Sequence, residues 1–116
     1  MILVLFEVTV KENCMDSYLA TAAKLKDQLA NAPGFIRSER FSSLVNERKL
    51  LSLSVWESEE AIDEWRNQQE HRKGQQMGQN SIFESYTITV ASPLRSYTDK
   101  MRQEAPTDSN AFFNLV

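Results

Sequence analysis

Residues 55–65 read Val-Trp-Glu-Ser-Glu-Glu-Ala-Ile-Asp-Glu-Trp, and they mark the passage from a strand to a helix. Residues 50–56 read as a strand that ends at Trp56, with Leu51, Leu53 and Val55 on one face and Leu50, Ser52, Ser54 and Trp56 on the other. Ser58 suits a helix N-cap, and the two glutamates that follow it suit the positive end of a helix dipole. The segment therefore predicts a strand that ends at Trp56 and a helix that begins after Ser58.

Two earlier stretches also predict strands. Residues 4–10 are rich in β-branched and aromatic residues and have apolar side chains on both faces near their start, which is typical of a strand that is central or covered on both sides. Residues 35–42 read as a strand as well, and unbroken alternation predicts that Phe35 and Arg37 share one face while Arg40 lies on the other. The sequence leaves open which of the two arginines faces the interior of the domain.

The first predicted helix spans residues 15–32. Its apolar side chains recur at helical spacing and form one stripe, and Lys26 is expected to lie mostly away from that stripe. Pro33 and Gly34 end the helix, because proline lacks an amide hydrogen and glycine adopts the backbone conformation that commonly follows a helix. The stripe consists of Met15, Tyr18, Leu19, Ala22, Leu25 and Leu29.

The second helix is expected to continue, whole or in two parts, as far as Met77. Its later half is very polar, so it should lie on the surface or rim a pocket. Residues 82–91 alternate again and predict a fourth strand, which Pro93 either ends or marks as an edge strand. Residues 96–116 show no sustained period and predict a tail with an apolar end.

The predicted elements follow the order βαββαβ. Right-handed crossovers convert this order into a ferredoxin-like antiparallel sheet with both helices on one face, which is an α+β fold. The other face carries large apolar residues, which a second copy would cover by packing sheet on sheet. We therefore expect residues 1–95 to form the domain, two copies to pair as a homodimer, and residues 96–116 to form a tail that packs on the partner.

The composition fits one globular domain. Hydrophobic residues make up 41% and charged residues 25% of the chain, and the formal net charge is -3. This mild acidic balance argues against nucleic-acid binding, which favours a basic face. We see no secretory signal and no membrane-spanning run, and the single Cys14 cannot form an internal disulfide, so we expect a cytoplasmic protein.

The residue types also limit which cofactors the chain could bind. One histidine, one cysteine and no spaced pair of ligands predict no metal site. The chain has 3 glycines and no glycine-rich phosphate loop, so flavin or nicotinamide binding by a standard motif is set aside. We therefore expect no cofactor.

Four features together resemble the antibiotic biosynthesis monooxygenase family: residues 55–65, the Glu70-His71-Arg72 triplet, residues 83–88 (Phe-Glu-Ser-Tyr-Thr-Ile) and the Pro33-Gly34-Phe35 turn. The resemblance covers residues 1–95. It implies a dimeric α/β barrel with a cavity between the sheet and the helices of each subunit. It also implies the activity of some members, which oxygenate phenolic or quinol-type substrates without metal or flavin while the protein binds, deprotonates and excludes water.

One branch of this superfamily degrades haem with an asparagine on the first strand and a tryptophan and a histidine from the second helix. Trp65 matches the tryptophan of that branch. The histidine position falls on Gln75, and the asparagine position falls on Phe6 or Glu7. Two of the three residues are missing, so the resemblance favours a general oxygenase over haem degradation.

Three residues are candidates for binding and proton transfer. His71 is the only histidine, and it is the natural base for a phenol or donor to a developing oxyanion; the alternative is a solvated histidine on the surface. Trp65, on the same helix, and Trp56, at the end of the third strand, suit stacking on a flat aromatic substrate. Core packing is the alternative for both tryptophans.

Two further side chains are candidates for substrate contacts. Arg37 is expected to hold an anionic substrate, or the anion formed on deprotonation, with Arg40 as the other choice. An edge strand protected by its charges is the alternative reading. Tyr86 on the last strand is placed to hydrogen-bond a substrate oxygen, and a purely structural tyrosine is the alternative.

The sequence thus predicts a cofactor-independent monooxygenase acting on a small aromatic or quinol-type substrate. His71 is its base, Trp65 and Trp56 form its aromatic wall, Arg37 holds its anion and Tyr86 contacts the substrate. The alternative is a non-enzymatic member of the fold that binds a small apolar ligand or a partner protein. A closed pocket into which His71 points favours the enzyme, and a collapsed core with His71 in solvent favours the binding protein.

Overall fold

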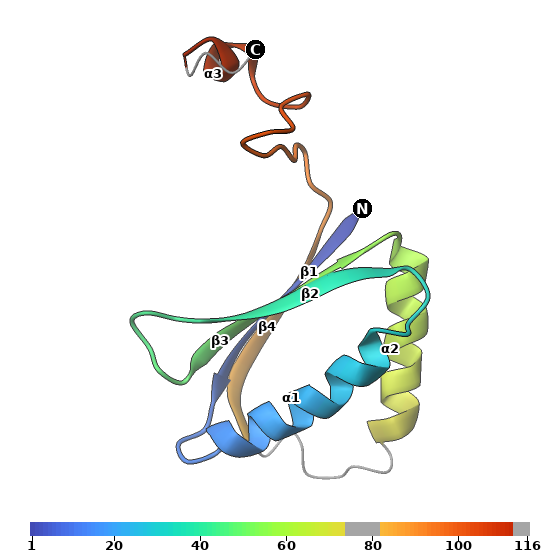
Figure 1. Ribbon diagram of the computed structural model, residues 1–116. Coiled ribbons are helices and arrows are strands. Elements are labelled where there is room, and N and C mark those ends of the chain that lie inside the picture. The colour runs from blue at the N-terminus through green and yellow to red at the C-terminus, as the bar shows by residue number, and fades with distance from the viewer. Residues whose placement is uncertain (74–81, 113–116) are drawn as a thin grey trace.

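The computed structural model describes the backbone of residues 1–73 and 82–112 and the side chains of residues 1–68 and 82–111. Within these residues it contains four strands and three helices (Figure 1). They are β1 (Ile2–Val10), α1 (Met15–Leu29), β2 (Phe35–Ser42), β3 (Lys49–Trp56), α2 (Glu59–Lys73), β4 (Phe83–Ala91) and α3 (Thr107–Phe112). No helix in this part of the chain is long and apolar enough to cross a membrane.

The strands form one antiparallel sheet in the order β2-β3-β1-β4. Helices α1 and α2 lie on the same face of this sheet (Figure 1). We call this side the helix face and the other side the outer face. The predicted ferredoxin-like α+β fold is therefore confirmed.

The predicted starts of both helices are confirmed. Helix α1 begins at Met15, and the Oγ of Ser58 accepts a hydrogen bond at 3.2 Å from the amide of Ala61 at the start of α2. Helix α1 ends at Leu29, which is earlier than the predicted residue 32, and residues 30–32 continue as hydrogen-bonded turns.

Gly34 sets how closely α2 approaches the turn between α1 and β2. Its φ of 81° lies in the left-handed region, which glycine adopts without strain. A Cβ added to Gly34 would lie 2.5 Å from the Cβ of Ala61 in the first turn of α2. Glycine is therefore needed here both for its backbone conformation and for its lack of a side chain.

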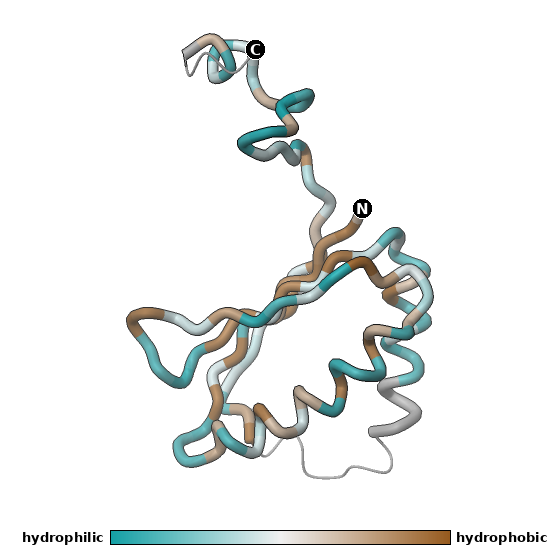
Figure 2. Tube along the Cα trace, viewed as in Figure 1, coloured by the Kyte–Doolittle hydropathy of each residue, from teal (hydrophilic) through white to brown (hydrophobic). Residues whose placement is uncertain are grey.

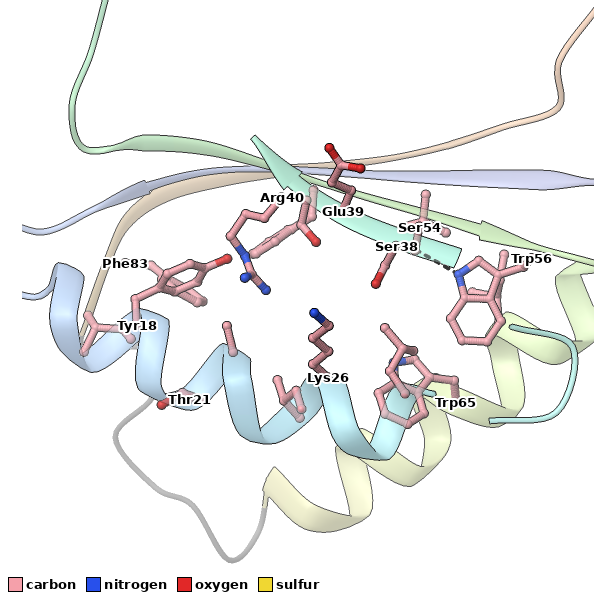
Figure 3. Close-up of a pocket in the computed structure, with 18 residues that line it drawn as sticks. Tyr18, Thr21, Lys26, Ser38, Glu39, Arg40, Ser54, Trp56, Trp65 and Phe83 are labelled. Carbon is pink, nitrogen blue, oxygen red and sulfur yellow. Dashed lines mark hydrogen bonds between the residues drawn. The ribbon is translucent and has the colours of Figure 1, made fainter. Parts of the chain in front are cut away.

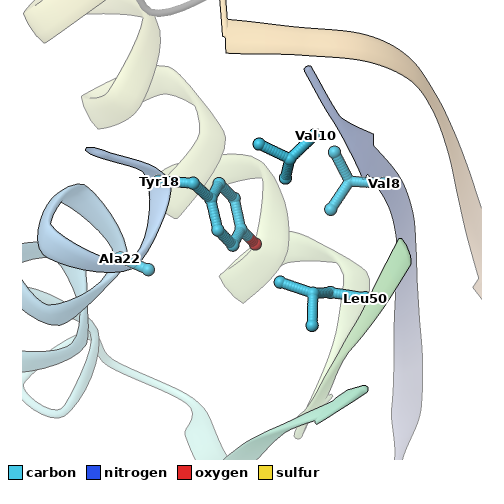
Figure 4. Packing of buried hydrophobic residues seen from close by; sticks show 5 residues of the cluster. All are labelled: Val8, Val10, Tyr18, Ala22 and Leu50. Atoms are coloured by element: carbon cyan, nitrogen blue, oxygen red, sulfur yellow. The ribbon is translucent and has the colours of Figure 1, made fainter. Parts of the chain in front are cut away.

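A buried core lies at one end of the sheet (Figure 4). Val8 and Val10 of β1 and Leu50 of β3 pack against Tyr18 and Ala22 of α1. The strand register pairs Val8 with Leu50, so both point to the helix face. Figure 2 shows the hydrophobic residues concentrated in the central strands, whereas much of α2 is hydrophilic.

An aromatic cluster lies at the other end of β3. Trp56 is 2% exposed there, and its ring packs edge-on against Phe35 with the ring centroids 5.4 Å apart. Between the two clusters β3 carries Ser52 and Ser54 on the helix face, paired with Phe6 and Val4 of β1. Large side chains at both ends of β3 and small ones in its middle leave a hollow between the sheet and α1.

Strand β2 contains an irregularity that reverses one expected face. Phe35 pairs with Trp56 while Arg37 pairs with Val55, so the register shifts at Ile36. An extra residue in one strand turns the following side chains to the opposite face. The prediction that Phe35 and Arg37 share a face is therefore wrong: Phe35 lies on the helix face and Arg37 on the outer face.

Both faces of the sheet retain apolar surface. On the helix face of the edge strand β4, Tyr86 and Ile88 are each 57% exposed. On the outer face, the leucines of β1 and β3 are half-buried and lie side by side in the sheet: Leu3, Leu5, Leu51 and Leu53. A helix layer covers only part of one face, and the outer leucines remain available for contact.

The chain leaves the sheet after Ala91 and runs away from the domain (Figure 1). The Cα radius of gyration is 17.3 Å, whereas a compact chain of this length has a radius of about 13 Å. The described tail is organised by Arg102, which donates hydrogen bonds to Asn110 at 2.9 Å and to Ser109 at 3.2 Å and stacks over the ring of Tyr97. The sequence did not predict α3, which spans fewer than two turns and shows no period.

Candidate functional site

A cavity of about 300 Å³ lies between the helix face of the sheet and helices α1 and α2 (Figure 3). Val4 and Phe6 of β1 and Ser52 and Ser54 of β3 line its sheet side. The small hydroxyl side chains of β3 create this space, because residues of leucine size at these positions would fill it. The sequence of β3 therefore accounts for the hollow, because on the helix face of this strand two serines lie between larger side chains.

Two tryptophans form one end of the cavity. The rings of Trp56 and Trp65 have centroids 6.3 Å apart, and both residues line the space. The indole N–H of Trp56 donates to Ser54 Oγ at 2.9 Å, so this ring is fixed and its one donor is occupied. Trp65 of α2 is half-buried, which leaves its ring available to a flat molecule in the cavity.

Three further aromatic rings form the other end. Phe83 lies edge-on to Tyr18 and to Phe6, with ring centroids 5.8 Å and 5.9 Å apart. Tyr86 packs beside Phe6 at 5.6 Å but does not line the cavity itself. The structure therefore places Tyr86 at the flank of the cavity, on the exposed edge strand, rather than in its wall.

Two cations enter the cavity from opposite walls. Arg40 of β2 points in from the sheet and Lys26 of α1 points in from the helix layer, with the hydroxyl of Ser38 between them and Trp65 (Figure 3). The guanidinium of Arg40 lies 5.6 Å from the ring centroid of Tyr18. Glu39 also borders the space, but its carboxylate points away from it (Figure 3).

The prediction that Lys26 lies away from the packed face of α1 is wrong. Lys26 follows Tyr18 and Ala22 at intervals of four residues, so it belongs to the same face of the helix. Its charge kept it out of an apolar stripe that was defined by hydropathy. The spacing alone was the signal that would have found it.

The structure brings some of the predicted site residues together and places others elsewhere. Trp56 and Trp65 line the cavity together, and Arg40 rather than Arg37 faces it. Arg37 lies on the outer face because of the register shift in β2, so it does not reach the space where a substrate would bind. His71 belongs to α2, but its side chain lies outside the described residues, and its role stays a prediction.

The structure also shows where two of the positions compared with the haem-degrading branch lie. Phe6 lines the cavity with an apolar ring, and Glu7 lies on the outer face, paired with Leu51. Gln75 lies outside the described residues. Across residues 1–68 and 82–111, no three side chains of His, Cys, Asp or Glu come together in a way that could hold a metal ion.

Sequence comparisons place this fold among known proteins. Residues 1–77 match the sequence model of the family described as antibiotic biosynthesis monooxygenase. A protein of Pyricularia oryzae named "Jasmonate monooxygenase ABM" is 36% identical over 96 residues, which make up 83% of this chain and 45% of that protein. The chain thus spans less than half the length of this relative.

A shorter relative and a solved structure also resemble this chain. The YqjZ protein of Bacillus subtilis is 31% identical over 83 residues, which cover 72% of this chain and 71% of that protein. A crystal structure of SnoaB, described as a cofactor-independent oxygenase from Streptomyces nogalater, has a TM-score of 0.69 at 13% identity and covers 82% of this chain and 94% of that one. This last likeness concerns the fold alone. Because the family match spans residues 1–77 and YqjZ is matched over most of its length, the chain belongs to the antibiotic biosynthesis monooxygenase family.

Proposed function

We propose that this protein is a monooxygenase that oxidises a small aromatic or quinol-type substrate in the cavity, without a metal or flavin. One observation carries the proposal: a cavity of about 300 Å³ with aromatic walls at both ends. Sites for small molecules are typically concave, mostly apolar and about 300 Å³ or larger. Trp65 supplies a ring face on which a planar substrate can stack.

Family membership supports oxygen chemistry. The Pyricularia oryzae relative is named as a monooxygenase, and SnoaB is described as a cofactor-independent oxygenase. The cavity supports the enzyme reading, because a collapsed core would leave no such space. The direction of His71, which is the other part of that distinction, lies outside the described residues. We therefore place the reaction in the cavity rather than on the protein surface.

The substrate itself would supply the electrons for the reaction. When a hydroquinone ring becomes a hydroxyquinone, one atom of O2 enters the product and the other leaves as water, so no external reductant is required. The tasks left to the protein are to bind the ring, to remove a proton and to exclude water. We assign ring binding to Trp65 against the fixed wall of Trp56, and proton removal to His71.

Oxygen uptake by the purified, chelator-treated protein tests this proposal. The substrates are hydroquinones and polyphenols with and without a carboxylate group, and the variants are His71→Ala and Trp65→Ala, with Arg66→Ala of the exposed side of α2 as the control. We expect uptake by the wild type and the control, and a loss of about a hundredfold in His71→Ala. Uptake that persists in His71→Ala moves the base elsewhere. Uptake at the chemical background with every substrate would favour ligand binding without catalysis.

We also propose that the protein acts as a homodimer. The half-buried leucines of β1 and β3 form an apolar strip on the outer face, which neither α1 nor α2 covers. Sheet-on-sheet packing with a second copy would bury this strip. The tail, which runs away from its own domain, would then extend across the partner.

Cys14 bears on the location of the protein. It is a free, half-buried cysteine, and the chain contains no other. Compartments that keep thiols reduced favour such a composition, so we propose a cytoplasmic location. Fractionation of the native host cells tests this assignment.

A further inference from the structure

Among the described residues, two charged side chains point into the cavity, and both are positive. Lys26 and Arg40 converge from opposite walls, while the carboxylate of Glu39 turns away (Figure 3). Within the described residues, the ion pairs join Arg48 to Glu84, Lys49 to Glu7 and Arg66 to Asp63, and none involves Lys26 or Arg40. The chain has 16 acidic and 13 basic residues, so a general excess of positive charge does not explain this pair.

We propose that Lys26 and Arg40 form an anion clamp for a carboxylate, and that the substrate is therefore a flat, apolar molecule carrying one carboxylate group. This inference rests on the proposed function, because it takes the cavity as the substrate site. The planar guanidinium of Arg40 can donate two parallel hydrogen bonds to the two carboxylate oxygens, and Lys26 adds a point charge from the other side. The hydroxyl of Ser38, which also points into the cavity, supplies a further donor (Figure 3).

The position of the clamp indicates how the substrate enters. Lys26 and Arg40 are exposed to solvent and also line the cavity, so they stand at its opening, whereas Trp56 and Tyr18 are buried. A carboxylate held at the opening keeps part of its hydration, while the apolar ring enters the aromatic interior. The ring of Tyr18 beneath the guanidinium restrains Arg40 before the ligand arrives. The substrate would thus bind ring first, with its charge at the opening.

Two naphthalene probes test the charge requirement directly. 2-Naphthoate and 2-naphthamide have nearly the same size and shape, but only the first is an anion. Titration calorimetry on the full chain at low ionic strength should show naphthoate binding roughly tenfold or more tightly than the amide, because hydrogen bonds to an ionised group are markedly stronger than neutral ones. Equal affinities for the two probes would overturn the proposal.

Methionine substitutions then locate the clamp, because methionine keeps most of the aliphatic stem and removes the charge. Lys26→Met and Arg40→Met should each remove most of the preference for naphthoate and leave the affinity for naphthamide nearly unchanged. Lys24→Met, two residues away on α1, is the matched control and should behave like the wild type. Arg37→Met, on the outer face of β2, distinguishes the two arginines: a larger loss with Arg37→Met than with Arg40→Met would contradict the assignment.

These binding measurements separate the clamp from the reaction. A clear preference for naphthoate that depends on Arg40, without oxygen uptake on any substrate, would leave the clamp in place and remove the monooxygenase. Oxygen uptake on neutral hydroquinones, with no preference for naphthoate, would leave the monooxygenase in place and remove the clamp. All four variants must also have unfolding midpoints near the wild-type value, which circular dichroism measures.

Discussion

The indole N–H of Trp56 donates a hydrogen bond to the hydroxyl of Ser54 at 2.9 Å, and the two side chains lie on the same face of β3. Ser54 thereby has two effects: it keeps the middle of the cavity open, and it holds one wall in a fixed orientation. A larger apolar residue would fill the space, and a residue without a hydroxyl would leave the indole donor unpaired.

Replacing Ser54 with alanine should therefore loosen this wall. The buried indole N–H would lose its acceptor, which typically costs about 1–3 kcal/mol of unfolding free energy. Urea unfolding measures the change. Ser52→Ala is the matched control, since Ser52 lines the same cavity from the same strand and makes no hydrogen bond to Trp56. An equal effect of the two substitutions would show that the hydrogen bond contributes nothing.

The two cavity tryptophans should respond differently to truncation. Trp56 is 2% exposed, so Trp56→Ala should lower the unfolding free energy by about 3–5 kcal/mol, as large-to-small changes in a core do. Trp65 is only half-buried, so Trp65→Ala should cost clearly less stability while it weakens the binding of aromatic ligands. Unfolding curves and ligand titration measure the two effects separately. A loss of stability as large for Trp65 as for Trp56 would make Trp65 a core residue.

Gly34→Ala should destabilise the domain for two separable reasons. A left-handed φ costs a non-glycine residue roughly 1–2 kcal/mol, and the added Cβ would meet Ala61 at 2.5 Å. A double-mutant cycle with Ala61→Gly separates them, because only the steric part depends on Ala61. We expect a coupling energy of about 1 kcal/mol or more in urea unfolding. Strict additivity of the two substitutions would show that α2 shifts to avoid the clash.

A charge on the outer face should break the proposed dimer. Leu5 and Leu53 are cross-strand partners on that face, so Leu5→Asp would place a carboxylate in the middle of the apolar strip. Light scattering at micromolar concentration should give a dimer mass for the wild type and a monomer mass for Leu5→Asp. Leu44→Asp, in the fully exposed hairpin between β2 and β3, is the control and should remain dimeric. A monomeric wild type would remove the dimer altogether.

Ending the chain after Tyr97 should weaken the same dimer. The described tail is held by its own Arg102 contacts and lies apart from its domain, so its removal should leave the fold intact. Sedimentation velocity over a range of concentrations should show a raised dissociation constant with an unchanged thermal unfolding midpoint at high concentration. An unchanged dissociation constant would show that the tail does not bind the partner.

Most of the fold could be predicted because its signals are local. Ser58 identified the start of α2, and the Pro33-Gly34 pair identified the end of the α1 region to within a turn. The β-bulge at Ile36 could not be predicted. The extra residue does not visibly change the alternation of residue types along β2, but it turns Arg37 to the opposite face of the sheet. The bulge is a property of the pairing between two strands, and neither strand alone reveals it.

The sequence identified two of the aromatic residues that line the cavity, whereas it missed the other rings and one of the two described cations. Trp56 and Trp65 were identified by size and by their place at a strand end and on a helix. Lys26 is hidden in the sequence pattern because its charge excludes it from an apolar stripe, although it follows Tyr18 and Ala22 at intervals of four residues. A site residue that is polar on an otherwise apolar face is the kind that a hydropathy pattern discards.

The two serines at the centre of β3 have a consequence for the folded state as a whole. Most small domains have well-packed side chains between their layers, whereas this chain has a cavity of about 300 Å³ there. A molecule that filled this cavity would complete the packing between the sheet and the helices, and its binding energy would add to the stability of the fold. A ligand bound there would therefore act as part of the hydrophobic core.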